Sequence, residues 1–312
     1  MGAVVVEGLT KVFAGGRKKP PVEAVRSISF EVEAGERLAF IGPNGAGKST
    51  SIKMLTGILQ PTSGRAHVLG LVPWRDRRTL TRRIGTLFGQ RSQLWLELRP
   101  RDTYRMLAAI HRLGDGALAR RVAELGQLLD ATDLFDTPVR SLSLGQRMRC
   151  ELAACLLHSP EVLFLDEPTI GLDLLAKQRF RELLVRLNDS DNTTIFLTSH
   201  DVADIEHVAR RAIVVNHGEV IYDDDVAVMR RSLLSTKLID IALASPGTAP
   251  AIAGVTVTAS SPTSIRLVVD TTVQSIRAAL DQLLIGLDVM DISVGDPPLE
   301  QVIAEIYEGS RR

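Results

Sequence analysis

The stretch that most constrains this chain is "FIGPNGAGKSTS" at residues 40–51. It fits the pattern G-x-x-x-x-G-K-[ST], in which the backbone N–H groups of a glycine-rich loop wrap around phosphate oxygens. Glycine suits such a loop because the backbone turns sharply and approaches its ligand with no Cβ in the way. "RLAF" before the loop is typical of a strand and "STSIKMLTGIL" after it of a helix, the order that the motif needs. The stretch predicts a nucleotide site.

The loop and the start of the next helix supply the expected phosphate contacts. Because the helix is predicted to begin near Lys48, its positive N-terminal end points at the phosphates. Lys48 is expected to reach the β- and γ-phosphates, and the Ser49 hydroxyl to bind Mg²⁺. The residues expected to contact the nucleotide here are Gly42, Pro43, Asn44, Gly45, Ala46, Gly47, Lys48, Ser49 and Thr50.

Apolar β-branched runs alternate with helical patterns from residue 3 to about 230. The predicted strands are "SISFEV", "RLAFIG", "VLFLD", "TTIFLTS" and "AIVVN". Three of them are apolar almost throughout, which is typical of a sheet covered on both faces. Two helical patterns at 100–113 and 116–130 interrupt the alternation, so we predict an inserted helical subdomain at about 95–160. The pattern indicates an α/β nucleotide-binding domain over residues 1–230.

The pattern of predicted strands and helices changes after Met229. "TKLIDIAL", "GVTVTA", "SIRLVVD" and "DVMDISV" are predicted strands, and "TVQSIRAALDQLL" is a predicted helix. A last helix, "PPLEQVIAEIYEG", carries an apolar stripe from Leu299 to Tyr307. Residues 231–312 are therefore predicted to form a small α+β domain with no catalytic constellation of its own.

Composition narrows the class of protein. Lys and Arg total 37 against 37 Asp and Glu, so no basic surplus points to nucleic acid. Cys150 and Cys155 suit neither a disulfide framework nor a zinc site, which favours a reduced cytosolic location. No apolar run approaches the roughly 18 residues of a membrane span, so we expect membrane association only through a partner. The arginine-rich "RDRRTLTRR" at 75–83 fits a solvated helix face better than a binding patch.

Acidic and histidine side chains follow two of the predicted strands. "EVLFLDEP" at 161–168 places Asp166 where it can hold Mg²⁺ and Glu167 where it can polarise an attacking water. "LTSHD" places His200 at the carboxyl end of a strand, where it faces the ligand crevice and can contact the γ-phosphate. The alternative is that these acids are merely solvated and that the histidine has only a structural role.

"SLSLGQRMRCELAACLLH" at 141–158 places Ser143 and Gly145 at the start of an amphipathic helix. A second helix N-terminus of this kind suits phosphate, although by itself it indicates only a capped helix.

Taken together, these motifs resemble those of the ATP-binding subunits of ABC transporters. "GPNGAGKST" is similar to their Walker A motif, "LSLGQ" to their signature, and "VLFLDEP" to their Walker B motif with its catalytic glutamate. "GLD" at 171–173 is similar to their D-loop and "TSH" to their switch-histidine motif. The resemblance implies a RecA-like P-loop core with an antiparallel β subdomain and a helical subdomain that carries the signature.

The resemblance also implies ATP and Mg²⁺ as ligands. Phe13 in "LTKVF" occupies the position that stacks on adenine. Gln90 would be the Q-loop residue that senses Mg²⁺ and the transmembrane partner, although it lies one residue later than the common spacing. Leu144 replaces the usual first glycine of the signature. The full set of implied site residues is Glu167, His200 and Lys48 for catalysis; Ser49, Gln90 and Asp166 for Mg²⁺; and Phe13, residues 42–50, Gln90, Ser143, Gly145, Gln146 and Asp173 for ATP.

Within that family, the sequence resembles the ATPases of the second class of ABC exporters, including the viologen and daunorubicin-resistance groups. This implies an ATPase that dimerises around two ATP as a homodimer. Each ATP would lie between Lys48, Ser49 and Gln90 of one copy and Ser143 and Gly145 of the other. The ATPase would drive export through separate membrane permease subunits at the cytoplasmic face of the plasma membrane. The alternative of a soluble ABC regulator of ribosomes or DNA repair is disfavoured by the single P-loop, the zero net charge and the lack of heptads. An importer ATPase is disfavoured only by the C-terminal domain.

The apolar residues of "QRSQLWLEL" at 90–98 allow two interpretations. The leucines and Trp95 could belong to the core of the helical subdomain or be partly exposed. Because the family receives its permease near the Q-loop, an exposed Trp95 would be an anchor for that partner.

Overall fold

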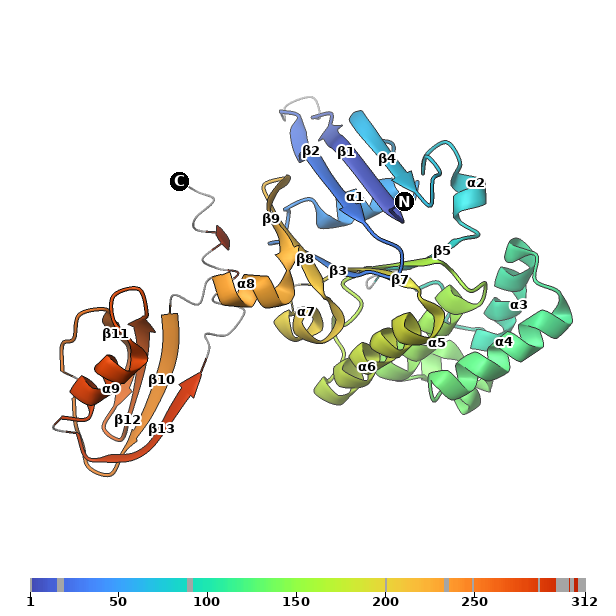
Figure 1. Cartoon of the computed structure of the whole chain (residues 1–312). Helices are drawn as coiled ribbons and strands as arrows, with labels where there is room; N and C mark the ends of the chain where they lie inside the picture. The colour runs from blue at the N-terminus through green and yellow to red at the C-terminus, as the bar shows by residue number, and fades with distance from the viewer. Residues whose placement is uncertain are drawn as a thin grey trace. The chain divides into compact units, whose positions relative to one another are not determined.

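The structure is a computed structural model that describes residues 2–15, 20–88, 92–199, 201–232, 236–248, 250–285 and 287–295, together with residues 303, 306 and 307. The chain divides into two compact units, Met1–Val226 and Ala227–Arg312 (Figure 1). Each unit has its own hydrophobic core.

A six-stranded sheet forms the centre of the first unit. Its order is β5-β6-β7-β3-β8-β9, and the first five strands run parallel while β9 is antiparallel to β8. Asp166 pairs with Thr198 in register, so the carboxyl ends of β6 and β7 meet at the same edge. The strands are β3 (Arg37–Ile41), β5 (Ile84–Phe88), β6 (Val162–Asp166), β7 (Thr194–Thr198), β8 (Arg211–Asn216) and β9 (Glu219–Asp225).

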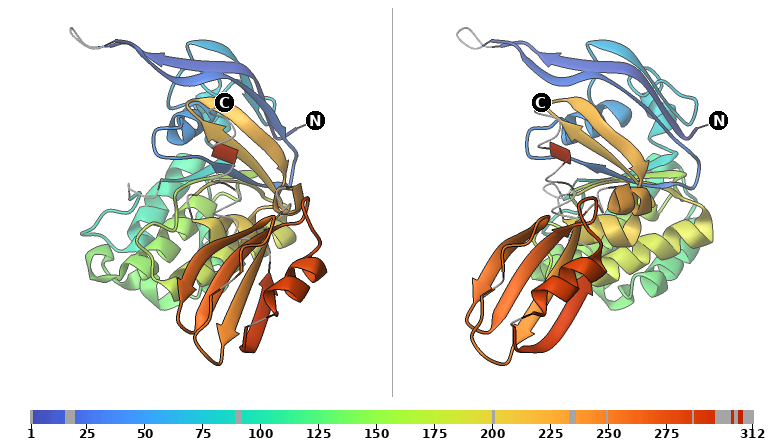
Figure 2. Two further views of the ribbon diagram at one scale, coloured as in Figure 1. Left: turned by 90° about the vertical axis from the view of Figure 1, so that its left-hand side faces the viewer. Right: turned by 60° about the vertical axis from the view of Figure 1, so that its left-hand side comes forward.

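A separate antiparallel sheet of three strands belongs to the same unit, in the order β2-β1-β4. Its strands are β1 (Val4–Phe13), β2 (Val22–Val32) and β4 (Ser63–Val68). Figures 1 and 2 show this sheet on the opposite side of the six-stranded sheet from α5 and α6. The α/β core with an antiparallel β subdomain is therefore confirmed.

The apolar strands β6 and β7 supply both faces of the core. Phe164 and Phe196 pack on the side of the three-stranded sheet, with ring centroids 5.4 Å apart. Leu163, Leu165 and Leu197 point to the opposite face, where they pack with the helices. Since successive strand residues face opposite ways, the uninterrupted apolar runs reflect a sheet covered on both faces, as predicted.

Between β5 and β6, the regular secondary structure of the described residues is helical. The helices are α3 (Pro100–His111), α4 (Asp115–Leu128), the 3₁₀ helices η1 (Thr132–Asp136) and η2 (Val139–Ser141), and α5 (Leu144–Leu156). Tyr104 of α3 ties this group together, since its hydroxyl donates to the Cys150 carbonyl of α5 at 2.9 Å. Cys150 and Cys155 are both buried and free, and burial raises the pKa of each thiol to about 12.

The other helices of the first unit are α1 (Lys48–Leu55), α2 (Arg77–Leu80), α6 (Leu174–Asp191) and α7 (Val202–Val208), and α8 (Val226–Ser232) lies at the division between the units. Two helices are shorter than predicted. The pattern "STSIKMLTGIL" extends to residue 59, but α1 ends at Leu55 because Gly57 adopts a φ of +71°. The pattern "VADIEHVARR" extends to Arg211, which instead begins β8.

The second unit is an antiparallel sheet in the order β11-β12-β10-β13, with α9 (Ile276–Leu283) against one face (Figures 1 and 2). Its strands are β10 (Thr236–Leu243), β11 (Val255–Ser261), β12 (Ser264–Asp270) and β13 (Val289–Gly295). α9 begins four residues later than predicted, because Ser275 caps it by accepting a hydrogen bond from the Ala278 N–H at 3.2 Å. Most of the predicted last helix lies outside the described residues.

Among the described residues, no helix is both long and apolar enough to cross a membrane.

Candidate functional site

The glycine-rich loop links the end of β3 to the first residue of α1. A Cβ on Gly42 would stand 2.4 Å from the Val215 carbonyl oxygen, and one on Gly47 would stand 2.4 Å from the Ala24 carbonyl oxygen. Gly45 has open space around it, but its φ of +84° is one that side chains disfavour. Gly47 is also the N-cap of α1, and no side chain caps this helix. The loop is therefore tightly packed at both ends and leaves the first N–H groups of α1 for another acceptor.

Lys48 is nearly buried at the start of α1. Its Nζ donates to the Gly42 carbonyl oxygen at 2.6 Å and lies 3.5 Å from Glu167 Oε1. The side chains of Lys48 and Glu167 are 7% and 15% exposed, so water screens this charge pair weakly. The loop thus holds a positive charge directly beside its own backbone.

Asp166 ends β6, and its carboxylate faces the Ser49 hydroxyl. Ser49 Oγ donates to Asp166 Oδ1 at 3.0 Å, and Thr198 Oγ1 of β7 donates to the same oxygen at 2.8 Å. A hydroxyl and a carboxylate are oxygen ligands of the kind that Mg²⁺ prefers, with further oxygens supplied by water and phosphate. The described residues hold no cluster of three or more His, Cys, Asp and Glu side chains that would bind a metal alone. The donor set fits Mg²⁺ bound together with a nucleotide.

Glu167 has a left-handed backbone, with a φ of +54°. Its N–H donates to both the carbonyl and the hydroxyl oxygen of Thr198, each at 3.1 Å. A non-glycine residue in this region stores backbone strain, and such strain concentrates at functional sites. The turn brings the Glu167 carboxylate beside Lys48 instead of continuing the strand.

Phe13 ends β1 and is 39% exposed. The Lys11 ammonium lies 5.3 Å from the ring centroid. Phe13 pairs with Val22 of β2, and the neighbouring Ala24 is the residue whose carbonyl contacts Gly47. Two residues of strand span about 7 Å, so Phe13 lies close to the phosphate loop along β2.

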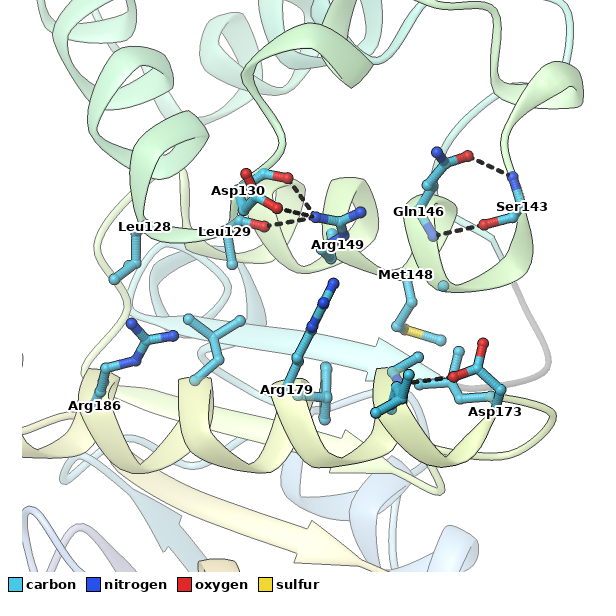
Figure 3. A pocket seen from close by; sticks show the side chains of 16 residues that line it. Leu128, Leu129, Asp130, Ser143, Gln146, Met148, Arg149, Asp173, Arg179 and Arg186 are labelled. Carbon is cyan, nitrogen blue, oxygen red and sulfur yellow. Dashed lines mark hydrogen bonds and ion pairs between the residues drawn. The ribbon is translucent and has the colours of Figure 1, made fainter.

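The signature residues form a second group, at the start of α5. Ser143 Oγ accepts from the Gln146 N–H at 3.2 Å, and Gln146 Oε1 accepts from the Ser143 N–H at 2.9 Å, which makes a capping box. Asp173 caps α6 in a similar way by accepting from the Ala176 N–H at 2.8 Å. Figure 3 shows these two helix starts facing each other across a cavity of about 450 Å³. Ser143, Gly145, Gln146 and Asp173 all line it, and residues 42–50 do not.

Leu144 is the first residue of α5 and is 42% exposed. A Cβ on Gly171 would lie 2.9 Å from Leu144 Cδ2, so the leucine side chain rests on the loop that leads to α6. The capping box of Ser143 and Gln146 is complete despite this leucine. The departure from the family pattern therefore keeps the local helix start intact.

Gln90 and His200 lie outside the described residues. The sequence reasoning missed Thr198, which contacts both Asp166 and Glu167. The sequence could have indicated Thr198, because it lies at the carboxyl end of a predicted strand, two residues before His200.

A further cavity of about 610 Å³ lies beside α2 and α3. Arg77, Arg78, Arg82 and Arg112 line it, and no Asp or Glu does. None of these four arginines forms an ion pair with another residue in the part of the chain that the structure describes. Arg75, Arg77 and Arg78 are exposed, in agreement with the predicted solvated helix face, and Arg77 and Arg78 of α2 also line this cavity. Trp95 is 54% exposed and Leu96 is 51% exposed, whereas Leu94 is buried.

Comparison with known proteins places these features in a family. Residues 25–170 match the family model described as "ABC transporter". The chain is 31% identical over 307 residues to the daunorubicin/doxorubicin resistance ATP-binding protein DrrA of Streptomyces peucetius, covering 96% of this chain and 91% of that protein. It is 31% identical over 205 residues to the ABC transporter ATP-binding protein NatA of Bacillus subtilis, covering 66% of this chain and 83% of NatA.

Solved structures agree on the fold. The chain resembles cbiO1 of Clostridium perfringens, part of the ABC transporter complex cbiONQ, with a TM-score of 0.64 and 27% identity over 75% of this chain and 95% of that one. A dimeric ATP-binding cassette bound to ADP and Pi has a TM-score of 0.64 and 24% identity over 72% of this chain and 98% of that one, a likeness of fold.

This chain belongs to the ABC transporter family, as one of its ATP-binding proteins. It is an ATPase with the RecA-like fold of that family.

Proposed function

We propose that this chain is the ATP-hydrolysing subunit of an exporter and acts at the cytoplasmic face of the plasma membrane, bound to separate permease subunits. The observation that carries the proposal is the meeting of Lys48, Ser49, Asp166 and Glu167 at one edge of the sheet. The likeness to a drug-resistance ATP-binding protein extends through the second unit, which favours export. It does not favour a ribosome or DNA-repair regulator.

In this proposal, the loop at residues 42–50 binds the phosphates of ATP, and Lys48 neutralises the charge of the terminal ones. Ser49, Asp166 and Gln90 would hold Mg²⁺, which supplies charge neutralisation on the phosphate oxygens when bound. Phe13 would stack on adenine. Glu167 would act as the base that orients the attacking water, and His200 would contact the γ-phosphate.

We also propose that a second copy of the chain completes each site. Ser143, Gly145, Gln146 and Asp173 lie at two helix N-termini that line one cavity, apart from the loop of the same chain. Helix N-termini favour anions, so a neighbouring copy can receive the exposed side of a bound ATP there. The dimeric form of a cassette with the same fold is consistent with this arrangement.

The permease contact would lie at the arginine-lined cavity and at Trp95. Arginines without ion-pair partners favour an acidic segment, and the half-exposed indole offers an apolar anchor. Gln93, which lines the same cavity, lies two residues from Trp95.

We expect Arg78→Glu and Trp95→Ala each to lower the recovery of the permease at least about tenfold, the effect of about 1.4 kcal/mol of lost binding. The tagged full-length chain would be purified from solubilised membranes of its own organism, and the recovery of co-purifying membrane protein measured. Arg75→Glu is the matched control, because Arg75 has the same charge in the same segment but does not line the cavity. ATP binding should remain normal in all three variants. If wild type recovers no membrane protein, the exporter proposal fails; if Arg78→Glu and Arg75→Glu behave alike, only the contact surface is wrong.

A chain that ends at Val226 is expected to bind ATP with a Kd within about threefold of the full-length value, a difference below about 0.7 kcal/mol. The reason is that the first compact unit ends there and every described residue assigned to the site precedes it. Isothermal titration with a nonhydrolysable ATP analogue would measure the Kd. A folded but non-binding chain would show that the second unit completes the site.

A further inference from the structure

Asp204 of α7 is a buried acid that the proposed chemistry does not use. Its side chain is 1% exposed and accepts three hydrogen bonds. Thr169 Oγ1 donates to Oδ2 at 2.5 Å, Ser199 Oγ donates to Oδ2 at 2.8 Å, and Arg181 Nε donates to Oδ1 at 2.6 Å.

The three donors come from separate segments of the chain. Thr169 lies two residues after Glu167, in the loop that follows β6. Ser199 lies just after β7 and directly precedes His200. Arg181 lies on α6, where it also reaches Asp201 Oδ1 at 3.2 Å. Asp204 therefore joins the two loops that carry the proposed catalytic residues to two helices.

The charges of this cluster are balanced. Arg181 contacts both acids, and Lys177 Nζ lies 2.6 Å from Asp201 Oδ2. A buried ion pair contributes little net stability compared with apolar residues of similar volume, because desolvation offsets the attraction. Stability alone is thus a weak reason for a carboxylate here, whereas its three fixed hydrogen bonds determine where the loops lie.

The strained backbone of Glu167 supplies the reason why such an anchor matters. Strain of this kind persists only where the surrounding structure holds the residue in place. The Glu167 N–H is held by its hydrogen bonds to Thr198. Two residues further along the chain, the Thr169 hydroxyl is held by its hydrogen bond to Asp204.

We propose that Asp204 is a positioning residue for ATP hydrolysis, which fixes the Glu167 loop through Thr169 and the loop before His200 through Ser199. Asp204 does not touch the nucleotide and acts through these two hydroxyls. The inference rests on the proposed role of Glu167 as the base.

The test compares Asp204→Asn with wild type in the full-length protein. Asparagine keeps the shape of the side chain but removes its charge and replaces one acceptor oxygen by a donor. Either the bond from Arg181 is lost, or the Thr169 and Ser199 hydroxyls must turn from donors into acceptors. We expect kcat for ATP hydrolysis to fall about 10- to 100-fold, the usual effect of removing a supporting group, while KM for ATP changes less than about twofold. Asp223→Asn is the matched control, because it breaks an Arg–Asp pair of the same 2.6 Å length at the edge of the sheet. It should leave kcat unchanged.

The Glu167→Gln background separates positioning from a general structural effect. If Asp204 acts through Glu167, then Asp204→Asn should cause much less further loss of kcat in Glu167→Gln than in wild type. An equal loss in both backgrounds, or an unchanged kcat in a folded Asp204→Asn, would overturn the inference. Wild-type turnover in Glu167→Gln would instead overturn the proposed base. Should Asp204→Asn not fold, Thr169→Val removes only the arm that leads to Glu167, and an unchanged kcat in that variant would decide against the proposal.

Discussion

Glu167→Gln is expected to lower ATP turnover about 10²–10⁴-fold, the effect of losing a general base. Glutamine preserves the size of the side chain but cannot accept the proton of the attacking water. The Ser49–Asp166 contact and the Lys48 contact with the Gly42 carbonyl do not depend on Glu167, so ATP binding should remain. Steady-state ATPase rates and a separate ATP-binding titration would measure the two effects.

The same variant should accumulate as a dimer when ATP and Mg²⁺ are present. ATP that bridges two copies stabilises the assembled state by mass action, and blocked hydrolysis removes the step that ends it. Sizing chromatography should show the dimer with ATP and the monomer with ADP. Glu161→Gln is the matched control, since Glu161 lies just before β6 and pairs with Arg83 away from the loop. Wild-type turnover in Glu167→Gln would refute the base assignment.

Mixing two inactive variants is expected to restore ATPase activity if each site is shared between copies. Lys48→Ala should weaken ATP binding about 10- to 150-fold, from the roughly 1.5–3 kcal/mol of a hydrogen bond to a charged group. Ser143→Arg should block the second half-site while each chain still binds ATP through its own loop. A heterodimer of the two variants then contains one site with both halves intact.

Activity of the mixture, measured against each variant alone, is the decisive comparison. Ser143 caps α5 through Gln146, so circular dichroism of Ser143→Arg must first show an intact fold. Ser159→Arg is a suitable control for the added charge, since Ser159 lies outside the cavity that Ser143 lines. A mixture no more active than its components would contradict the shared site.

The fold was largely predictable because its strands are buried on both faces. Uninterrupted apolar runs such as "VLFLD" identify such strands without any knowledge of their neighbours, and the glycine-lysine loop locates the site beside them. Helix ends were less predictable. Gly57 and Ser275 set the end of α1 and the start of α9 through local backbone geometry and capping, which hydrophobic spacing does not reveal.

The contacts between distant segments could not be predicted from the sequence. Thr198 meets Asp166 across 32 residues, and Asp204 meets Thr169 across 35. Each of these residues is ordinary in its own segment and gains its role only from strand register and helix placement. The arginines of α2 are a similar case, because Arg112, which directly follows α3, lines the same cavity.

The left-handed backbone of Glu167 lowers the stability of the folded chain at the position that the proposed ATP hydrolysis requires. A residue other than glycine in this conformation costs the folded chain about 1–2 kcal/mol, whereas asparagine tolerates it better. A chain released from the need to hydrolyse ATP would therefore gain by exchanging this acid for asparagine. An acid at position 167 is thus itself a sign of selection for hydrolysis, and a degenerate cassette that only binds nucleotide would be expected to lose it first.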